Sequence, residues 1–405
     1  MRWINVLHAY QPPDWDPAVI RKVSRECYRP MTDFLVAHPT VKVTLNLAGS
    51  LTEQLVALGE DRVLQNIATL VARGQVELMT MPKYHPLIPF VSRDELEAQL
   101  LANAEVNRAR FGDAYRPAGL FPPELAINND LGATAEAFGL RWIVLDELAY
   151  NGTLGAIDPR RACVWNGTNV RVVFRDRRVS DFFAFRVTAD EVRGFANIAQ
   201  QLGVETDTIL TAMDFENLGH HRPGAAPAWQ RLATQPDVET LTVSEHLDFP
   251  GDRDEVTPIA SSWSTDDHDL AKGIPYPLWQ HPDNPVHTAI HALADRTREL
   301  VLAHRDHPGY TEARHRLDRA QASDVYWWAS MRPWWDAPIV LRESREFLHV
   351  VEPLSLTDRE LTALWERVRQ LTNKWERTGQ AKTARQAYLA DHRPDVFFAG
   401  QHIER

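Results

Sequence analysis

The stretch AGLFPPELAIN, residues 118–128, joins an apolar run to two prolines and a single carboxylate. Pro122 and Pro123 have fixed φ angles and no backbone N–H, so a strand that enters this stretch cannot easily continue through them. Glu124 is therefore expected on a stiff turn at the carboxyl end of a strand, where reactive groups collect in an α/β barrel. A surface glutamate after a Pro-Pro loop would give the same local pattern, so residues elsewhere in the chain must distinguish these two interpretations.

Short apolar segments alternate with amphipathic ones on both sides of this stretch. We expect helices at about 61–73, 92–110 and 130–138, and strands at 3–7, 41–47, 76–80, in the segment before Glu124, and at 142–145, 170–174, 209–213 and 241–243. Strands and helices thus alternate about seven times. This pattern predicts an α/β fold with parallel strands and right-handed crossovers, either a barrel or a doubly wound sheet.

The pattern changes after about Thr257. A connecting stretch rich in Trp, Asp, His and Pro covers 258–285, and the chain beyond it is mainly helical. The clearest helix is predicted over 357–378, with a capping box at Thr357 and Glu360, an apolar stripe, and Gly379 as the stop. We therefore expect a barrel over 1–257, a connecting stretch over 258–285 that completes the cleft, and a C-terminal helical domain over 286–405.

The composition is that of an ordinary globular protein and excludes several classes of partner. The 405 residues include 44 basic and 55 acidic ones, which gives a net charge of −11. Such an acidic chain is a poor candidate for binding nucleic acid or an anionic membrane surface. Two cysteines without a CxxC spacing give no disulfide framework and no zinc-finger pattern. No apolar run is long enough for a signal peptide or a membrane span, and we expect a cytoplasmic protein.

Polar clusters follow several predicted strands at the point where each strand ends. These clusters are His8 with Gln11, Glu77, Glu124, Asp146 with Glu147, and Asp214 with Glu216. The carboxyl ends of parallel strands share one rim of a barrel, so residues distant in sequence converge there. A pair of carboxyl groups across a cleft is the basic equipment of glycoside hydrolysis. The same groups could also serve as metal ligands or as structural salt bridges.

Five segments carry a resemblance to a known family. In chain order they are His8-Ala-Tyr10-Gln11-Pro12, Gly74-Gln-Val-Glu77, Phe121-Pro-Pro123-Glu124, Asp214-Phe-Glu216-Asn-Leu-Gly219, and the looser region from Trp263 to Asp269. In this order and spacing they resemble the motifs of glycoside hydrolase family 57. Members of that family act on α-glucans, and the resemblance implies an incomplete (β/α)7 barrel with a C-terminal α-helical bundle domain.

The resemblance also implies a mechanism and a set of site residues. Glu124 resembles the nucleophile and Asp214 the general acid/base of a reaction that retains the anomeric configuration. The remaining site residues are expected to bind an α-glucan or oligosaccharide substrate, and they are His8, Tyr10, Gln11, Glu77, Phe121, Glu216, His221, Trp263 and Asp266. We expect no metal and no cofactor.

Three residues depart from the family pattern. Tyr10 stands where the family usually has a second histidine, Phe121 replaces a tryptophan, and Phe215 replaces a glycine. Because Glu124 and Asp214 are both present, these departures concern substrate preference before they concern catalysis. The short interval between the two carboxylates resembles that of the amylase and glucanotransferase members.

Three hypotheses remain open from the sequence. The leading one is hydrolysis or transglycosylation of α-1,4-glucans. The second is a catalytically silent glucan-binding protein, which the three departures suggest. The third is a metal-dependent carbohydrate deacetylase, which would need one aspartate and two histidines as ligands, commonly with an H-x-x-x-H pair. No such pair lies beside an aspartate at a predicted strand end.

Overall fold

The chain forms two compact units. The computed structural model describes residues 1–391 except 159–161, 188–193, 204–206, 250–252 and Pro333. The first unit comprises 1–83 and 91–263, and the second comprises 84–90 and the described chain from Ser264 onward. The stretch over 258–285 is thus shared between the units. Its first residues belong with the first unit, where the Trp263 N–H donates to the Glu124 carbonyl at 3.0 Å and the Ile127 N–H donates to the Ser261 carbonyl at 3.1 Å.

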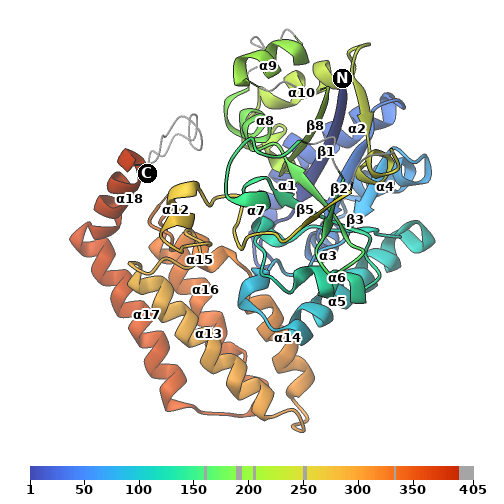
Figure 1. The fold of residues 1–405 in the computed structure, drawn as a ribbon. Helices are drawn as coiled ribbons and strands as arrows, with labels where there is room; N and C mark the ends of the chain where they lie inside the picture. Colours follow the sequence, from blue (N-terminus) through green and yellow to red (C-terminus); the bar gives the residue numbers. More distant parts are fainter. Residues whose placement is uncertain (159–161, 188–193, 204–206, 250–252, 333, 392–405) are drawn as a thin grey trace. The chain divides into compact units, whose positions relative to one another are not determined.

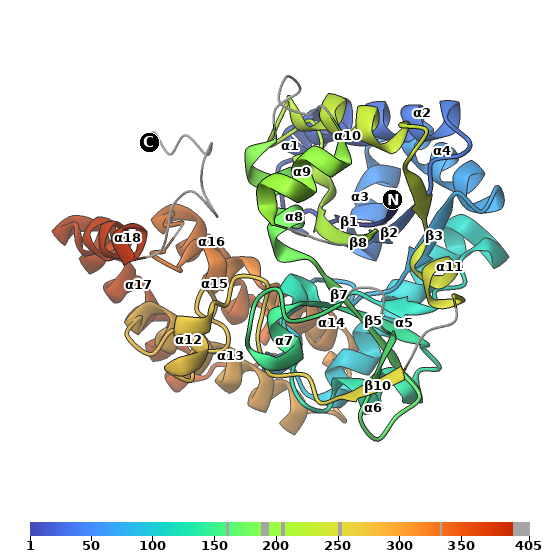
Figure 2. The ribbon, with the colours of Figure 1, turned by 45° about the horizontal axis from the view of Figure 1, so that its top comes forward.

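The strands of the first unit form two sheets (Figures 1 and 2). One sheet has the order β3-β2-β1-β8 with β9 also paired to β1, and the other has the order β10-β6-β7-β5-β4. The strands are β1 (Arg2–Ala9), β2 (Val43–Leu47), β3 (Val76–Met79), β4 (Gly119–Leu120), β5 (Trp142–Asp146), β6 (Ala162–Trp165), β7 (Arg171–Arg175), β8 (Thr208–Asp214), β9 (Glu239–Leu241) and β10 (Arg253–Val256). The described pairs are parallel except for β6 with β7.

The two sheets continue into each other on both sides. Thr80 joins β3 to β4, because its N–H donates to the Gly119 carbonyl and its own carbonyl accepts from the Phe121 N–H, each at 2.9 Å. On the other side, the Asp176 N–H that follows β7 donates to the Leu210 carbonyl of β8 at 2.8 Å. The strands β1, β2, β3, β4, β5, β7 and β8 therefore follow one another around an incomplete (β/α)7 barrel, as predicted.

Helices and helical turns fill the connections of the first unit. They are α1 (Pro17–Val23), η1 (Ser24–Tyr28), α2 (Arg29–Ala37), α3 (Gly49–Ala57), α4 (Asp61–Ala72), α5 (Arg93–Phe111), η3 (Gly112–Ala114), η4 (Pro123–Leu125), α6 (Leu131–Ala137), α7 (Leu148–Asn151), α8 (Arg177–Asp181), η5 (Phe182–Arg186), α9 (Phe195–Leu202), η6 (Phe215–Asn217), α10 (Ala225–Ala233) and α11 (Val243–Leu247). The strand predicted at 241–243 is wrong for its last two residues, because β9 ends at Leu241. Thr242 is instead the N-cap of α11, and its side chain accepts from the Glu245 N–H.

Strand β1 lies at the centre of the core. Trp3 on its helix-facing side is fully buried and packs against Phe183 at 5.1 Å, Phe195 at 4.8 Å and Trp229 at 5.5 Å between ring centroids. Side chains alternate along a strand, so His8, which is five residues further on, points to the opposite face of β1 from Trp3, into the barrel. The packing of Trp3 therefore determines which way His8 faces.

The second unit is a helical bundle in which α13, α16 and α17 lie side by side (Figure 1). Its elements are η2 (Ile88–Phe90), α12 (Asp267–Ala271), α13 (Pro285–Ala303), α14 (Tyr310–Ala320), α15 (Asp324–Trp328), α16 (Ala337–His349), η7 (Glu352–Leu354), α17 (Arg359–Thr378) and α18 (Gln380–Asp391). Helix α17 ends at Gly379 with φ of 69°, as predicted, but its N-cap is Asp358 and not Thr357. Within the described chain, none of the helices combines the length and the apolar character that a membrane crossing requires.

Candidate active site

Glu124 lies on a turn with unusual backbone angles. It follows β4 and the two prolines, and its φ of 59° and ψ of 16° fall in the left-handed region, as does the φ of 48° at Leu125. A residue with a side chain adopts this conformation at a cost of about 1–3 kcal/mol, and the surrounding structure must hold it there. Part of that support comes from Trp263, whose indole Nε1 donates to Glu124 Oε2 at 2.7 Å. The carboxylate is thereby fixed in orientation and half-buried.

Asp214 is the last residue of β8 and lies level with His8 on β1. His8 is in turn paired with Asn46 on β2, so the three side chains share one face near the carboxyl ends of neighbouring parallel strands. Burial raises the pKa of Asp214 to about 6, although the charge of Arg175 opposes this shift. An aspartate with such a pKa holds a proton over a range in which ordinary aspartates have lost theirs.

His8 connects the surroundings of the two carboxyl groups. Its Nδ1 lies 2.6 Å from Asn46 Oδ1, and its ring stacks on Phe121 at 4.3 Å with an interplanar angle of 6°. Trp263, the partner of Glu124, meets the His8 ring edge to face at 6.4 Å. Burial lowers the pKa of His8 to about 4, so the ring is neutral at neutral pH. Both carboxyl groups are thus connected to His8. Glu124 is bound by Trp263, which contacts the His8 ring, and Asp214 lies level with His8 on the neighbouring strand.

Glu216, two residues after Asp214, connects three segments of the chain. Its Oε1 accepts from the Tyr10 N–H at 3.3 Å, from Gln11 Nε2 at 3.2 Å and from the Tyr28 hydroxyl. The side chain is only 3% exposed. Burial, together with the charge of Asp214, raises the pKa of Glu216 to about 8. Glu216, Tyr10 and Gln11 therefore bind one another and fix the position of the loop after β1 relative to the end of β8.

Two arginines that the sequence analysis did not single out hold the neighbouring part of the rim. Arg175 Nε donates to Asp146 Oδ2 at 2.7 Å, and Arg177 Nε donates to the same carboxylate at 3.0–3.1 Å. The Arg175 guanidinium also lies 5.5 Å from the ring centroid of Trp263. Although burial alone would raise it, these two guanidinium groups hold the pKa of Asp146 below its usual value. The one signal in the sequence was the position of Arg175 directly after the predicted strand 170–174.

We expect Asp146→Ala to lower the free energy of unfolding by about 3–5 kcal/mol. Asp146 is fully buried, and its loss leaves Arg175 and Arg177, which are 4% and 2% exposed, without their shared carboxylate. Urea unfolding followed by circular dichroism measures the change. The matched control is Asp113→Ala on an exposed turn, which should alter the free energy by less than about 0.5 kcal/mol. A similarly small loss in Asp146→Ala would contradict a stabilising role for this cluster.

Three of the predicted site residues lie outside the group around His8. Glu77 was predicted at the carboxyl end of a strand, but it is the second residue of β3. It lies two positions before Met79, the residue of β3 that is level with Asn46. Its carboxylate accepts from the Ser244 N–H at 3.0 Å and from the Ser244 hydroxyl, toward the amino ends of the strands. His221 is exposed on the loop after β8, next to His220.

Asp266 belongs to the second unit. It is the N-cap of α12, where its side chain accepts from the Asp269 N–H at 2.7 Å. Within the described ranges, no group of three or more His, Cys, Asp or Glu side chains is arranged to hold a metal ion.

Comparisons with known proteins agree on one family. The sequence model described as Glycosyl hydrolase family 57 matches residues 2–258. An alpha-amylase of Pyrococcus horikoshii is 22% identical over 262 residues, which are 61% of this chain and 40% of that protein. A 4-alpha-glucanotransferase of Thermococcus kodakarensis is 23% identical over 147 residues, which are 36% of this chain and 22% of that protein. The matches thus span less than half the length of these curated relatives.

Solved structures share the fold at low sequence identity. A GH57-type branching enzyme from Pyrococcus horikoshii superposes with a TM-score of 0.67 and 16% identity, covering 92% of this chain and 94% of that one. The 4-alpha-glucanotransferase from Thermococcus litoralis gives a TM-score of 0.64 and 17% identity, covering 88% of this chain and 59% of that one. These two likenesses show the shared fold.

Proposed function

Because the chain belongs to glycosyl hydrolase family 57, we propose that it is a retaining enzyme that cleaves or transfers α-1,4-linked glucans, with Glu124 as nucleophile and Asp214 as general acid/base. The proposal rests on two carboxyl groups near His8 whose surroundings differ. Glu124 accepts a hydrogen bond from Trp263 on a constrained turn, and Asp214 has a pKa raised to about 6 at the partly buried end of β8. Retaining glycosidases need one carboxyl group of each kind.

In the first step, protonated Asp214 donates its proton to the glycosidic oxygen while a Glu124 oxygen attacks the anomeric carbon. The bond between that carbon and the leaving oxygen breaks, and a glycosyl ester of Glu124 forms. In the second step, ionised Asp214 takes a proton from water or from an acceptor sugar hydroxyl. The oxygen so activated attacks the anomeric carbon and releases Glu124. Two inversions give net retention.

In this proposal the partly exposed rings of Tyr10 and Trp263 provide the sugar-binding surface, and the fully buried ring of Phe121 supports them. Phe121 and Trp263 meet edge to face at 6.1 Å between ring centroids, and Tyr10 lies 6.2 Å from His8 in a stacked arrangement. His8 is neutral, so it can exchange a hydrogen bond with a sugar hydroxyl without carrying a charge into the site. Of the other predicted binding residues, Gln11 and Glu216 act by holding this surface in position.

Incubation with maltoheptaose tests the proposal. Products that are only shorter than the substrate indicate hydrolysis, whereas a ladder of shorter and longer products indicates transfer. Proton NMR at early times should show newly formed α-anomers, since retention is expected. A protein that binds maltoheptaose without altering it would contradict the enzyme proposal, and early β-anomers would contradict the retaining mechanism.

We expect Trp263→Phe to lower kcat about ten- to a hundredfold with little change in Tm. The phenyl ring keeps most of the packing against His8 and Phe121 but removes the Nε1 donor to Glu124, and a hydrogen bond to a charged group contributes about 1.5–3 kcal/mol. Steady-state kinetics and a melting curve give the two readouts. Trp335→Phe is the matched control, because it removes an equivalent indole bond to Glu376 in the second unit. Equal kinetic losses in both variants would contradict a specific role for the bond to Glu124.

A further inference from the structure

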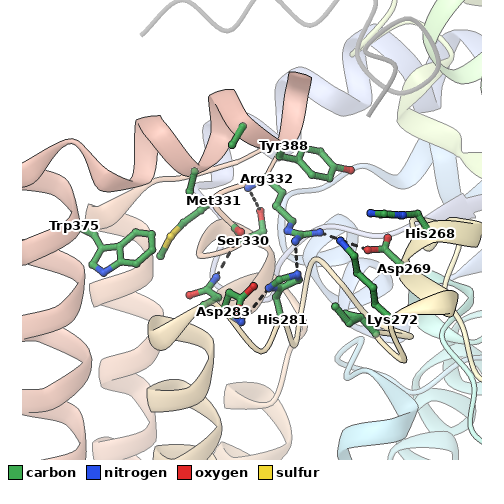
Figure 3. Close-up of a pocket in the computed structure, with 14 residues that line it drawn as sticks. His268, Asp269, Lys272, His281, Asp283, Ser330, Met331, Arg332, Trp375 and Tyr388 are labelled. Carbon is green, nitrogen blue, oxygen red and sulfur yellow. Dashed lines mark hydrogen bonds and ion pairs between the residues drawn. The ribbon is translucent and has the colours of Figure 1, made fainter. Parts of the chain in front are cut away.

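The helical unit contains a cavity of its own. Its volume is about 280 Å³, and its walls come from α12 and the segment after it, from residues 281–284 and 330–332, and from α17 and α18 (Figure 3). All of the lining residues belong to the second unit. The Arg332 guanidinium lies centrally, between His281, Asp269 and the ring of Tyr388 (Figure 3).

His281 and Arg332 face each other with a mismatch of hydrogen-bonding groups. Burial lowers the pKa of His281 to about 4, so its ring is neutral and has one N–H and one acceptor nitrogen. The Asp283 N–H points at Nδ1 at 3.1 Å, and Arg332 Nη2 points at Nε2. Both of these neighbours are donors. Whichever nitrogen carries the proton, one donor is left facing another donor.

Arg332 has further unused donor capacity. Its Nη1 is buried and has no hydrogen-bond partner within the described chain, and the ion pair with Asp269 is long at 3.7 Å. The guanidinium lies 5.1 Å from the ring centroid of Tyr388. Burial lowers the pKa of Arg332 below its usual value, even though Asp269 and Asp283 act in the opposite direction. The neighbouring carboxylates therefore do not fully compensate the burial of this charge.

We propose that this cavity binds an oxyanion of the phosphate class beside Arg332 and His281, with Lys272 as a second cation. An oxyanion brings acceptor oxygens and negative charge together, so it can accept from the Arg332 guanidinium and from an N–H at His281 Nε2. Nδ1 of His281 is then the acceptor for the Asp283 N–H. A neutral sugar hydroxyl brings an acceptor together with a further donor and no charge. Asp269 reaches Arg332 only through the long ion pair of 3.7 Å and is also part of the capping box of α12, while Asp283 is exposed to solvent.

The remaining walls suit the rest of a phosphate ester. Trp375, Met331 and Tyr388 line the side of the cavity toward α17 and α18 (Figure 3). Such apolar and aromatic surfaces accommodate the body of a ligand whose charged group is held elsewhere. The same site chemistry therefore accepts free phosphate or an ester, and the experiment separates the two.

Titration calorimetry on the intact chain, at constant ionic strength, tests this proposal with inorganic phosphate and with glucose 1-phosphate. We expect saturable binding of phosphate, and tighter binding of the ester if the apolar wall takes part. Arg332→Gln should raise the Kd for phosphate at least about tenfold, since a charge-assisted hydrogen bond is lost. Arg345→Gln is the matched control, because Arg345 is exposed on α16 outside the cavity and its loss changes the net charge equally. The Kd should stay unchanged in that variant.

Two further variants guard against a folding defect. Lys272 is exposed, so Lys272→Gln should fold normally and weaken phosphate binding severalfold. Arg332→Lys keeps the charge without the forked donors, and its affinity should fall between those of the parent and Arg332→Gln. Absence of saturable binding to the parent, or an equal loss in Arg345→Gln, would overturn the proposal. Turnover of maltoheptaose does not enter this test, so it is independent of the proposed enzyme activity.

Discussion

Glu124→Gln is expected to lower kcat on maltoheptaose by at least about a thousandfold. The amide has nearly the same shape as the carboxylate, and its oxygen can still accept from Trp263 Nε1, so the turn at 122–125 should remain folded. It cannot, however, form the glycosyl ester. Initial rates from quantitative chromatography give the measurement. Glu105→Gln on the exposed face of α5 is the matched control and should leave the rate unchanged.

Chemical rescue then separates the nucleophile from the general acid. In Glu124→Ala, azide can enter from the face that the glutamate has vacated and displace the leaving group directly, which gives a β-glycosyl azide. An α-glycosyl azide would mean that a glycosyl-enzyme had still formed on another residue, and Glu124 would lose its assigned role.

Asp214→Asn is expected to lower kcat/KM on maltoheptaose about a hundred- to ten-thousandfold, because the leaving sugar oxygen then receives no proton. Fluoride leaves without such help. For α-maltosyl fluoride kcat/KM reports the formation of the glycosyl-enzyme, so it should remain within about tenfold of the parent value. Asp113→Asn, an exposed aspartate, serves as the control on both substrates. Equal losses on both substrates would indicate a structural defect and contradict the role of Asp214 as acid.

The pH profile follows from the same assignment. The acid must be protonated, and the pKa of Asp214 is raised to about 6, so kcat/KM should be highest below this value and fall as the pH rises through it. Glu216, with a pKa raised to about 8, keeps its proton over that range and does not produce this limb. The limb should be absent from the residual activity of Asp214→Asn.

The positions of Glu124 and Asp214 were predictable because they depend on local signals. Two prolines stop the strand before Glu124, and an apolar run ends at Asp214, so both residues lie at carboxyl ends of parallel strands. The barrel brings such ends together without any long-range information in the sequence. The alternation of strands and helices was predictable for the same reason.

The contacts that orient these groups were not predictable from the sequence. The bond from Trp263 to Glu124 joins residues 139 positions apart, and the ion pairs of Asp146 with Arg175 and Arg177 depend on the register between β5 and β7. Glu77 was misplaced for a different reason. The predicted strand at 76–80 already made Glu77 its second residue, and the observed β3 begins at the same residue, so Glu77 did not belong among the residues at strand ends.

The sequence around Asp266 allows two interpretations. An aspartate followed three residues later by another acidic residue is the signature of a helix cap as well as a candidate sugar ligand. In the structure Asp266 forms that cap, on α12 of the second unit. Elsewhere in the second unit, Trp327, Trp328 and Trp334 pack against one another at 4.9–5.8 Å between ring centroids.

Trapping the covalent intermediate tests the role of Glu124 as nucleophile. A 5-fluoroglycosyl fluoride of the α-configuration forms a glycosyl-enzyme that breaks down slowly, and peptide mass spectrometry locates the added sugar. We expect one labelled peptide with the sugar on Glu124, and no label in Glu124→Gln. A sugar attached to any other residue, or turnover of maltoheptaose to β-anomers with no adduct at all, would contradict this role.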